Sequence, residues 1–211
     1  MNITHDSADA RPLEDSLRGA AHPTPAAWER IRGELAARAD ADGLLDVAVE
    51  RHDTPLGRVL LGATAEGLVR VALPTEDEDA VLEELARRVS VRVLVAPRTA
   101  LTGARRQLDE YFEGGRHAFD VALDWRLTAG FRRAVLRATA QIPYGRTASY
   151  REVATRARSP AAVRAAGTAL ATNPLPILVP CHRVLRSGGA LGSYRGGPEA
   201  KAQLLRLEGA V

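Results

Sequence analysis

Short runs of aliphatic and β-branched residues, separated by turn residues, dominate the chain between residues 44 and 124. They predict strands over 45–49, 58–62 and 68–73, with turns at 54–57 and 65–67. Apolar residues at helical spacing then predict helices near 77–88 and 99–113, with a strand near 91–95 between them. Strands mixed with helices in this way predict a small α/β unit over 44–124, and nothing in it resembles a phosphate loop or a ligand cluster.

Residues 1–43 are predicted to be an N-terminal extension with one helix. Thr24-Pro25 is typical of an N-cap followed by proline at the first helical position. Trp28, Ile31 and Leu35 follow at helical spacing, so we expect them to form a packing face. The first 22 residues show no periodicity and are predicted to be mobile.

The pattern changes to short helices over residues 125–211. A helix near 127–140 is predicted to end before the Pro143 to Gly145 turn. The capping box from Ser149 to Glu152 opens a short helix to about 156, and Ser159-Pro160 is expected to cap a second one over 160–171. Two short helices and a tight turn fit a helix-turn-helix, although any helical hairpin gives this pattern. A last helix is predicted near 198–208.

Composition narrows the classes of protein to consider. The chain has 211 residues, 45% of them hydrophobic and 26% charged, which is typical of a globular protein. No apolar run approaches the ~20 residues of a membrane span. The polar, acidic start offers no secretory signal. The single cysteine, Cys181, excludes an internal disulfide framework and a multi-cysteine zinc site, so a reducing cytoplasmic location is expected.

The net charge of +3 hides a strong asymmetry. Residues 125–211 carry 14 Lys and Arg against three acids, whereas 1–124 carry 15 against 23. A basic half favours a polyanionic partner such as nucleic acid over a merely solvated surface. The expected helix 160–171 is rich in alanine, with Arg164 as its one long charged side chain. Such a slim helix suits either a neighbouring helix or a nucleic-acid groove.

Residues 173–184 carry the most chemistry. Three prolines stiffen an apolar segment that leads into Cys181, followed at once by His182 and Arg183. A lone cysteine in such a run is more often a small buried hydrophobe. A neighbouring base or cation can instead lower its pKa and make it nucleophilic. The residues alone leave both interpretations open.

Several ordered motifs resemble the O6-alkylguanine-DNA alkyltransferases. They are Ile142-Pro143-Tyr144-Gly145, Ser149-Tyr150, Val163-Arg164-Ala165, Asn173-Pro174, Pro180-Cys181-His182-Arg183-Val184, Gly192-Ser193-Tyr194, Gly196-Gly197 and Leu207-Glu208-Gly209. The resemblance covers roughly residues 44–211. It implies an α+β fold, in which a ribonuclease H-like domain precedes a mostly helical domain with a helix-turn-helix. It also implies direct DNA repair, in which the protein transfers the alkyl group to its own cysteine once.

The resemblance also assigns roles to residues. Cys181 matches the alkyl acceptor, His182 the residue that deprotonates it through a water molecule, and Glu208 the carboxylate that orients this histidine. Asn173 matches the side chain that holds the turn after the DNA-reading helix. Tyr150 matches the tyrosine that contacts the flipped guanine and assists its departure.

Further residues are expected at the DNA and the pocket. Arg164 matches the arginine that fills the gap left by the flipped base, in a minor-groove complex. The DNA-binding set implied by the resemblance is Arg164, Ser159, Ala165, Gly167 and Thr168; the pocket set is Tyr194, Arg195, Val184 and Pro176. Some members have a small residue where this chain has Arg195, so the pocket rim is expected to differ. The zinc-binding cysteines of some members are missing, and neither metal nor cofactor is expected.

The chemistry agrees with these roles, because alkyl transfer from oxygen needs a soft nucleophile, a base and a group that orients the base. Glu208, near the end of its predicted helix, opposes the helix dipole by about 0.3–1 kcal/mol, which an imidazolium partner would offset. The expected partner is double-stranded DNA carrying O6-alkylguanine, or O4-alkylthymine, without a membrane or an obligate protein partner. Two alternatives remain: a non-catalytic relative that only binds the lesion, and a Cys–His hydrolase.

Overall fold

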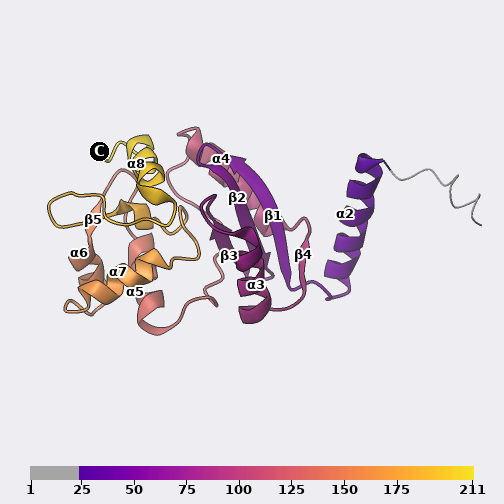
Figure 1. Cartoon of the computed structure of the whole chain (residues 1–211), viewed down its shortest axis with the longest axis horizontal. Coiled ribbons are helices and arrows are strands. Elements are labelled where there is room, and N and C mark those ends of the chain that lie inside the picture. The colour runs from indigo at the N-terminus through magenta and orange to yellow at the C-terminus, as the bar shows by residue number, and fades with distance from the viewer. Residues whose placement is uncertain (1–23) are drawn as a thin grey trace, which may run out of the picture.

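The computed structural model describes residues 24–211, which fold into a sheet-containing part and a helical part, with one outlying helix (Figure 1). The elements in chain order are α2 (Pro25–Ala41), β1 (Val47–Thr54), β2 (Gly57–Thr64), β3 (Gly67–Ala72), α3 (Glu78–Arg88), β4 (Val93–Val95), α4 (Thr99–Phe112), α5 (Gly130–Ala140), β5 (Ala148–Ser149), α6 (Tyr150–Arg156), α7 (Val163–Ala171), the 3₁₀ helix η1 (Cys181–Arg183), β6 (Val184–Leu185) and α8 (Gly197–Leu207). This confirms the expected α+β class.

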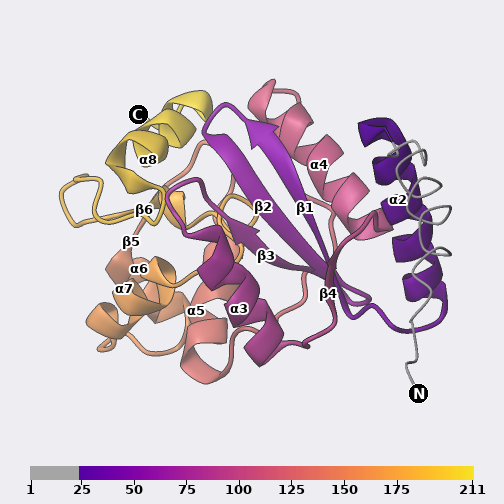
Figure 2. The same cartoon turned by 45° about the vertical axis from the view of Figure 1, so that its right-hand side comes forward.

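The first part is a four-stranded mixed sheet with the strand order β3-β2-β1-β4. β1 pairs antiparallel with β2 and parallel with β4 (Figure 2). The helix α3 connects β3 to β4, and such a helical crossover lets β4 join the sheet in the parallel direction. α4 packs on one face of the sheet, and its Leu101, Leu108 and Tyr111 are fully buried there. The predicted strands and helices of this part are present, most with slightly shifted ends, but β1 runs to Thr54, five residues beyond its predicted end at 49.

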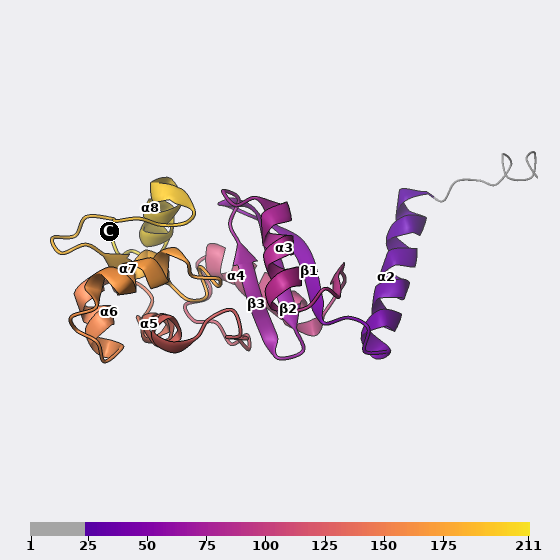
Figure 3. The same cartoon turned by 60° about the horizontal axis from the view of Figure 1, so that its bottom comes forward.

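The helical part packs α5, α6 and α7 against one another, with η1 and α8 beside them (Figure 3). Its capping box is confirmed, because Ser149 Oγ accepts from the Glu152 N–H and the Glu152 carboxylate accepts from the Ser149 N–H. The predicted start of the second helix is wrong. α7 begins at Val163, because the Ser159 carbonyl accepts from the Ala162 N–H and closes a turn ahead of the helix.

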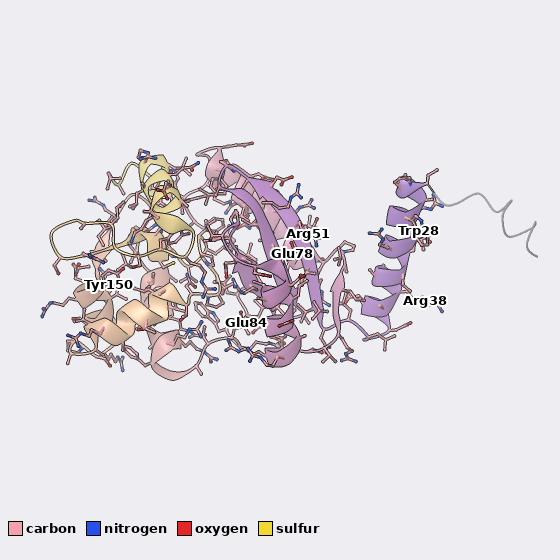
Figure 4. All side chains as sticks on the ribbon, viewed as in Figure 1. Trp28, Arg38, Arg51, Glu78, Glu84 and Tyr150 are labelled. Atoms are coloured by element: carbon pink, nitrogen blue, oxygen red, sulfur yellow. The ribbon has the colours of Figure 1, made fainter. Side chains whose placement is uncertain are left out.

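α2 lies apart from the sheet, and the expected packing face on it is wrong. Thr24 does cap the helix, accepting from the Ala27 N–H at 3.2 Å. However, Trp28, Ile31 and Leu35 are 48%, 41% and 65% exposed. Figure 4 shows Trp28 on this outlying helix. Among the side chains of α2 that the structure describes, Ala36 is buried and Ala39 is partly buried against the core, so the helix contacts the rest of the protein through small residues. The prediction of a mobile N-terminus concerns residues 1–22, which lie outside the described part.

The two parts meet along β3. The Val71 N–H donates to the Pro174 carbonyl at 2.8 Å, so the edge of the sheet is hydrogen-bonded to the segment that leads to Cys181. A parallel bridge between Leu68 and Leu123 adds the connecting chain to the same edge. The sheet therefore supports the proline-rich segment directly. Within residues 24–211 no helix has the length and apolarity to cross a bilayer.

Candidate active site

Cys181 lies at the first position of η1, buried beneath the helical part. The Asn173 side chain donates one N–H bond to Cys181 Sγ at 3.2 Å and another to the Val179 carbonyl at 2.8 Å, and its oxygen accepts from the Leu175 N–H. Asn173 therefore holds both the thiol and the turn after α7. Burial raises the pKa of the Cys181 thiol, opposed by the Asn173 hydrogen bond and the Lys201 charge.

His182 is fully buried and paired with Glu208, with 2.9 Å between Nε2 and Oε1. Burial lowers the pKa of His182 although the carboxylate opposes this, so the imidazole is neutral. Because a carboxylate only accepts hydrogen bonds, this contact assigns the proton to Nε2. Nδ1 is then an acceptor, and it is buried without a hydrogen bond to the described part of the protein. The ring is thus oriented to take up a proton at Nδ1.

Glu208 is the centre of a buried network that is larger than the sequence predicts. Arg183 donates to both carboxylate oxygens, at 2.8 and 2.9 Å, and the Tyr111 hydroxyl donates at 2.6 Å. Burial works to raise the pKa of Glu208, but these bonds and that of His182 hold it at about 2. The Arg183 guanidinium therefore places a positive charge beside Glu208 at the end of α8, in addition to the His182 partner that the sequence predicts.

Two buried residues of the candidate site, one in this network and one outside it, were not predicted from sequence in these roles. Tyr111 comes from α4, far along the chain, so no local motif could associate it with Glu208. Lys201, on α8, is fully buried, and its Nζ donates to the Val184 carbonyl at 2.6 Å. Burial lowers the pKa of Lys201 to about 8, and its charge favours the Cys181 thiolate. A lone lysine among the apolar residues of α8 was the available signal.

A groove of about 730 Å³ lies on the helical part, and one of its lining residues, Tyr150, is near enough to Cys181 to interact with its charge. Its lining includes Tyr150 from α6, together with Arg164, Gly167 and Thr168 from α7. Figure 4 shows Tyr150 on the helical part, far from α2. A Cβ at Gly167 would lie 3.8 Å from the Tyr150 ring, so the slim helix and the ring are neighbours. Four of the predicted site residues thus share one groove.

The groove is basic. Arg151, Arg164 and Arg186 line it, and none of the three forms an ion pair within the part of the chain that the structure describes. Ala165 is exposed on α7, and Ser159 is half-buried in the turn before it. Three unneutralised guanidinium groups along one groove suit a phosphate backbone.

The predicted pocket residues occupy different places. Tyr194 packs edge-on to His182, with 6.3 Å between ring centroids, and its hydroxyl is buried without a partner in the described chain. Pro176 and Val184 are buried and do not line the groove. Arg195 pairs with Glu76 of the first part, with 2.7 Å between Nη1 and Oε2. Among residues 24–211 no cluster of His, Cys, Asp and Glu could hold a metal ion.

The sequence matches the models of two protein-family domains. Residues 49–125 match the ribonuclease-like domain of 6-O-methylguanine DNA methyltransferase, and residues 130–210 match its DNA binding domain. The inducible methylated-DNA–protein-cysteine methyltransferase of Bacillus subtilis is 39% identical over 148 residues, which cover 70% of this chain and 82% of that protein. The constitutive enzyme of the same organism is 38% identical, covering 74% and 92%.

Solved structures agree. The O6-methylguanine methyltransferase of Mycobacterium tuberculosis has a TM-score of 0.67 and 35% identity, covering 78% of this chain and 93% of that one. A structure of the M. tuberculosis protein in complex with DNA has a TM-score of 0.66 and 34% identity, covering 79% and 94%. With this fold, a buried Cys–His–Glu network and such relatives, the chain belongs to the methylated-DNA–protein-cysteine methyltransferase family.

Proposed function

We propose that this protein repairs O6-alkylguanine in double-stranded DNA by moving the alkyl group irreversibly to Cys181, one lesion per molecule. Alkyl transfer from DNA to a protein cysteine is the activity of the family, and DNA is the partner. The observation that carries the assignment to Cys181 is its position. Its thiol, bonded to Asn173, is next in sequence to the buried, neutral His182.

The reaction begins with the thiol proton. Because burial raises the pKa of Cys181, the thiol needs a base, and His182 Nδ1 accepts the proton through a water molecule. Glu208 stabilises the resulting imidazolium. The thiolate sulfur then attacks the alkyl carbon in line, the S–C bond forms, and the C–O bond to guanine breaks. Its electron pair stays on the guanine oxygen.

Departure of the guanine requires a hydrogen-bond donor as this negative charge develops. Tyr150 can supply it, because burial raises the pKa of its hydroxyl and keeps it protonated. A Cβ at Gly192 would lie 2.8 Å from that hydroxyl oxygen, so the glycine lets the loop approach it. The guanine anion takes a proton from the Tyr150 hydroxyl and leaves as the neutral base. The proton held by the imidazolium passes through solvent and restores the tyrosine, so the thiol proton ends on the guanine overall.

The lesion must leave the duplex to reach Cys181, because the thiol is buried in the protein. We assign the minor-groove contact to α7, whose alanine-rich surface lets its backbone approach closely. Arg164 is exposed on this helix and is long enough to fill the gap in the base stack. We also assign Ser159, in the turn before α7, and Ala165 and Thr168, on α7, to the DNA contact, and Tyr194 to the wall of the pocket for the flipped base.

Intact-mass analysis tests the proposal. The wild-type protein is incubated with excess duplex containing O6-methylguanine, and peptide mapping locates any added mass. We expect one added methylene per protein, on Cys181, with the DNA restored to guanine. A hydrolase would process many substrate molecules without a lasting adduct, and a lesion-binding protein would leave the DNA methylated. Either result contradicts the proposal.

A further inference from the structure

Arg195, which follows the pocket residue Tyr194, makes three hydrogen bonds to two separate parts of the chain. Its guanidinium donates to Glu76 Oε2 at 2.7 Å and to the Ala171 carbonyl at 3.3 Å. Its own carbonyl accepts from the Thr75 hydroxyl at 2.8 Å. Glu76 and Thr75 belong to the segment between β3 and α3, whereas Ala171 is the last residue of α7. The residue therefore joins the pocket loop to the sheet-containing part and to the proposed DNA-reading helix.

Glu76 is itself a rigid anchor. Its carboxylate accepts from the fully buried Arg70 side chain and, at 2.9 Å, from the Leu73 N–H. Burial works to raise the pKa of Glu76, but the hydrogen bonds from Arg70 and Leu73, together with the charges of Arg70 and Arg195, keep the pKa below its ordinary value. The Glu76 side chain is 12% exposed and that of Arg195 27%, so solvent and salt screen this pair less than a surface pair.

The loop that Arg195 fixes carries the wall of the proposed pocket. A Cβ at Gly196 would lie 2.9 Å from the Tyr194 ring and 3.0 Å from Leu73, so ring, loop and sheet meet here with no space to spare. The Tyr194 ring in turn packs against His182. A shift of the loop away from Glu76 would therefore move the ring that lies beside the proposed base.

We propose that Arg195 is a positioning residue for alkyl transfer, through which the first part of the molecule sets the place of the Tyr194 loop. The inference rests on the proposed function of Tyr194 as a pocket wall. The positive guanidinium is also suited to the C-terminal end of α7, where carbonyl groups lack helical partners. One side chain thus fixes the Tyr194 loop both to Glu76 and to the last residue of α7.

The test compares Arg195→Ala, Arg195→Lys and Thr75→Val with wild type in single-turnover methyl transfer over a series of methylated-duplex concentrations. Thr75→Val keeps the shape of its side chain but removes the hydroxyl that holds the Arg195 carbonyl. Arg206→Ala is the matched control, since Arg206 is an exposed arginine of α8 that lies outside the groove. Melting curves establish that each variant is folded.

We expect Arg195→Ala to lower the transfer rate at saturating DNA by about fivefold or more, the effect of losing an ordinary hydrogen bond from the active complex. Thr75→Val should lower it in the same direction. The half-saturating DNA concentration should stay within twofold of wild type, because the groove arginines are retained. Arg195→Lys should recover most of the rate, since an ammonium group can still pair with Glu76. Arg206→Ala should match wild type.

The inference is overturned if Arg195→Ala transfers at the wild-type rate, or if it changes only the half-saturating concentration, which would make Arg195 a DNA contact. Equal loss in the Lys and Ala variants would also overturn it. Failure of the wild-type protein to become methylated would instead refute the proposed function, so the two failures are distinguishable.

Discussion

Methylation of Cys181 should destabilise the folded protein, because the site holds the thiol without spare room. The side chain is 5% exposed and is enclosed by the Asn173 amide, the proline-rich segment and the buried residues of the helical part. The methyl group stays behind when the guanine leaves. It must then be accommodated in a packed environment that was formed around a thiol.

Two contributions set the magnitude. Adding a carbon to a well-packed site typically costs about 1–3 kcal/mol. Weakening the Asn173 bond to Sγ costs about 1 kcal/mol more, because a thioether is a poor acceptor and the amide is buried. The sum is about 2–4 kcal/mol of a total stability of about 5–15 kcal/mol. At roughly 2–4 °C for each kcal/mol in a protein of this size, the melting temperature should fall by about 4–16 °C.

Differential scanning calorimetry measures this effect on protein that has reacted fully, after the repaired DNA is removed. The control is Cys181→Ser protein put through the same incubation and purification, which should show no change. An unchanged or higher midpoint for the methylated protein would refute the reasoning, since the pocket would then accept the product without strain. Hydrogen exchange of the Asn173 side-chain amide tests the second contribution separately. If the melting temperature falls but this amide stays as protected as in the unmethylated protein, the part assigned to its hydrogen bond is refuted.

Four further outcomes are expected. Cys181→Ser should retain DNA affinity in gel shifts but lose methyl transfer, because a hydroxyl is a far weaker nucleophile at neutral pH. Arg164→Ala should slow repair of duplex DNA more than reaction with free O6-benzylguanine, which needs no extrusion; equal loss would assign Arg164 to the pocket. Duplex affinity should fall steeply with salt, by about 0.9 in log–log slope for each phosphate contacted, and a flat dependence would exclude an electrostatic interface. Because the pKa of Glu208 is held at about 2, its contribution to stability is complete above pH 4.5 and lost as the pH falls toward 2; urea melts should show this loss in wild type and less of it in Glu208→Gln.

Local sequence signals predicted the elements well and the long-range contacts poorly. The capping box at Ser149 and the turn glycines fix short segments by themselves, so their helices and strands could be placed from the sequence. The start of α7 was misplaced, because Ser159 uses its carbonyl in a turn rather than its hydroxyl in a cap. The apolar spacing of α2 predicted a packed face, yet spacing cannot reveal whether a partner surface is within reach.

The candidate site shows the same division. The residues from Asn173 to Arg183 are continuous in sequence, so they could be recognised together as a candidate site. Glu208 is distant in sequence and was assigned to the site only by the family resemblance; its contact with His182 supports that assignment. Tyr111 and Glu76 were not predicted to take part, because each lies in the first part of the chain, at a large sequence separation from the residue that it contacts. No periodicity or local motif carries that information.

These two residues change the role of the sheet-containing part, which its sequence presented only as a scaffold. Tyr111 donates a hydrogen bond to the carboxylate that orients His182, and Glu76 holds the loop that carries Tyr194. Both side chains are held firmly: Tyr111 is on the packed helix α4, and Glu76 is in the turn after the edge strand β3, where it is bonded to the Leu73 N–H. A base and a pocket wall that are fixed from outside the helical part need little reorganisation when the lesion arrives. Extrusion of the guanine from the duplex costs free energy, so the flipped nucleotide is available to Cys181 only briefly. A histidine and a pocket wall that are already in place allow the thiol to react during that time.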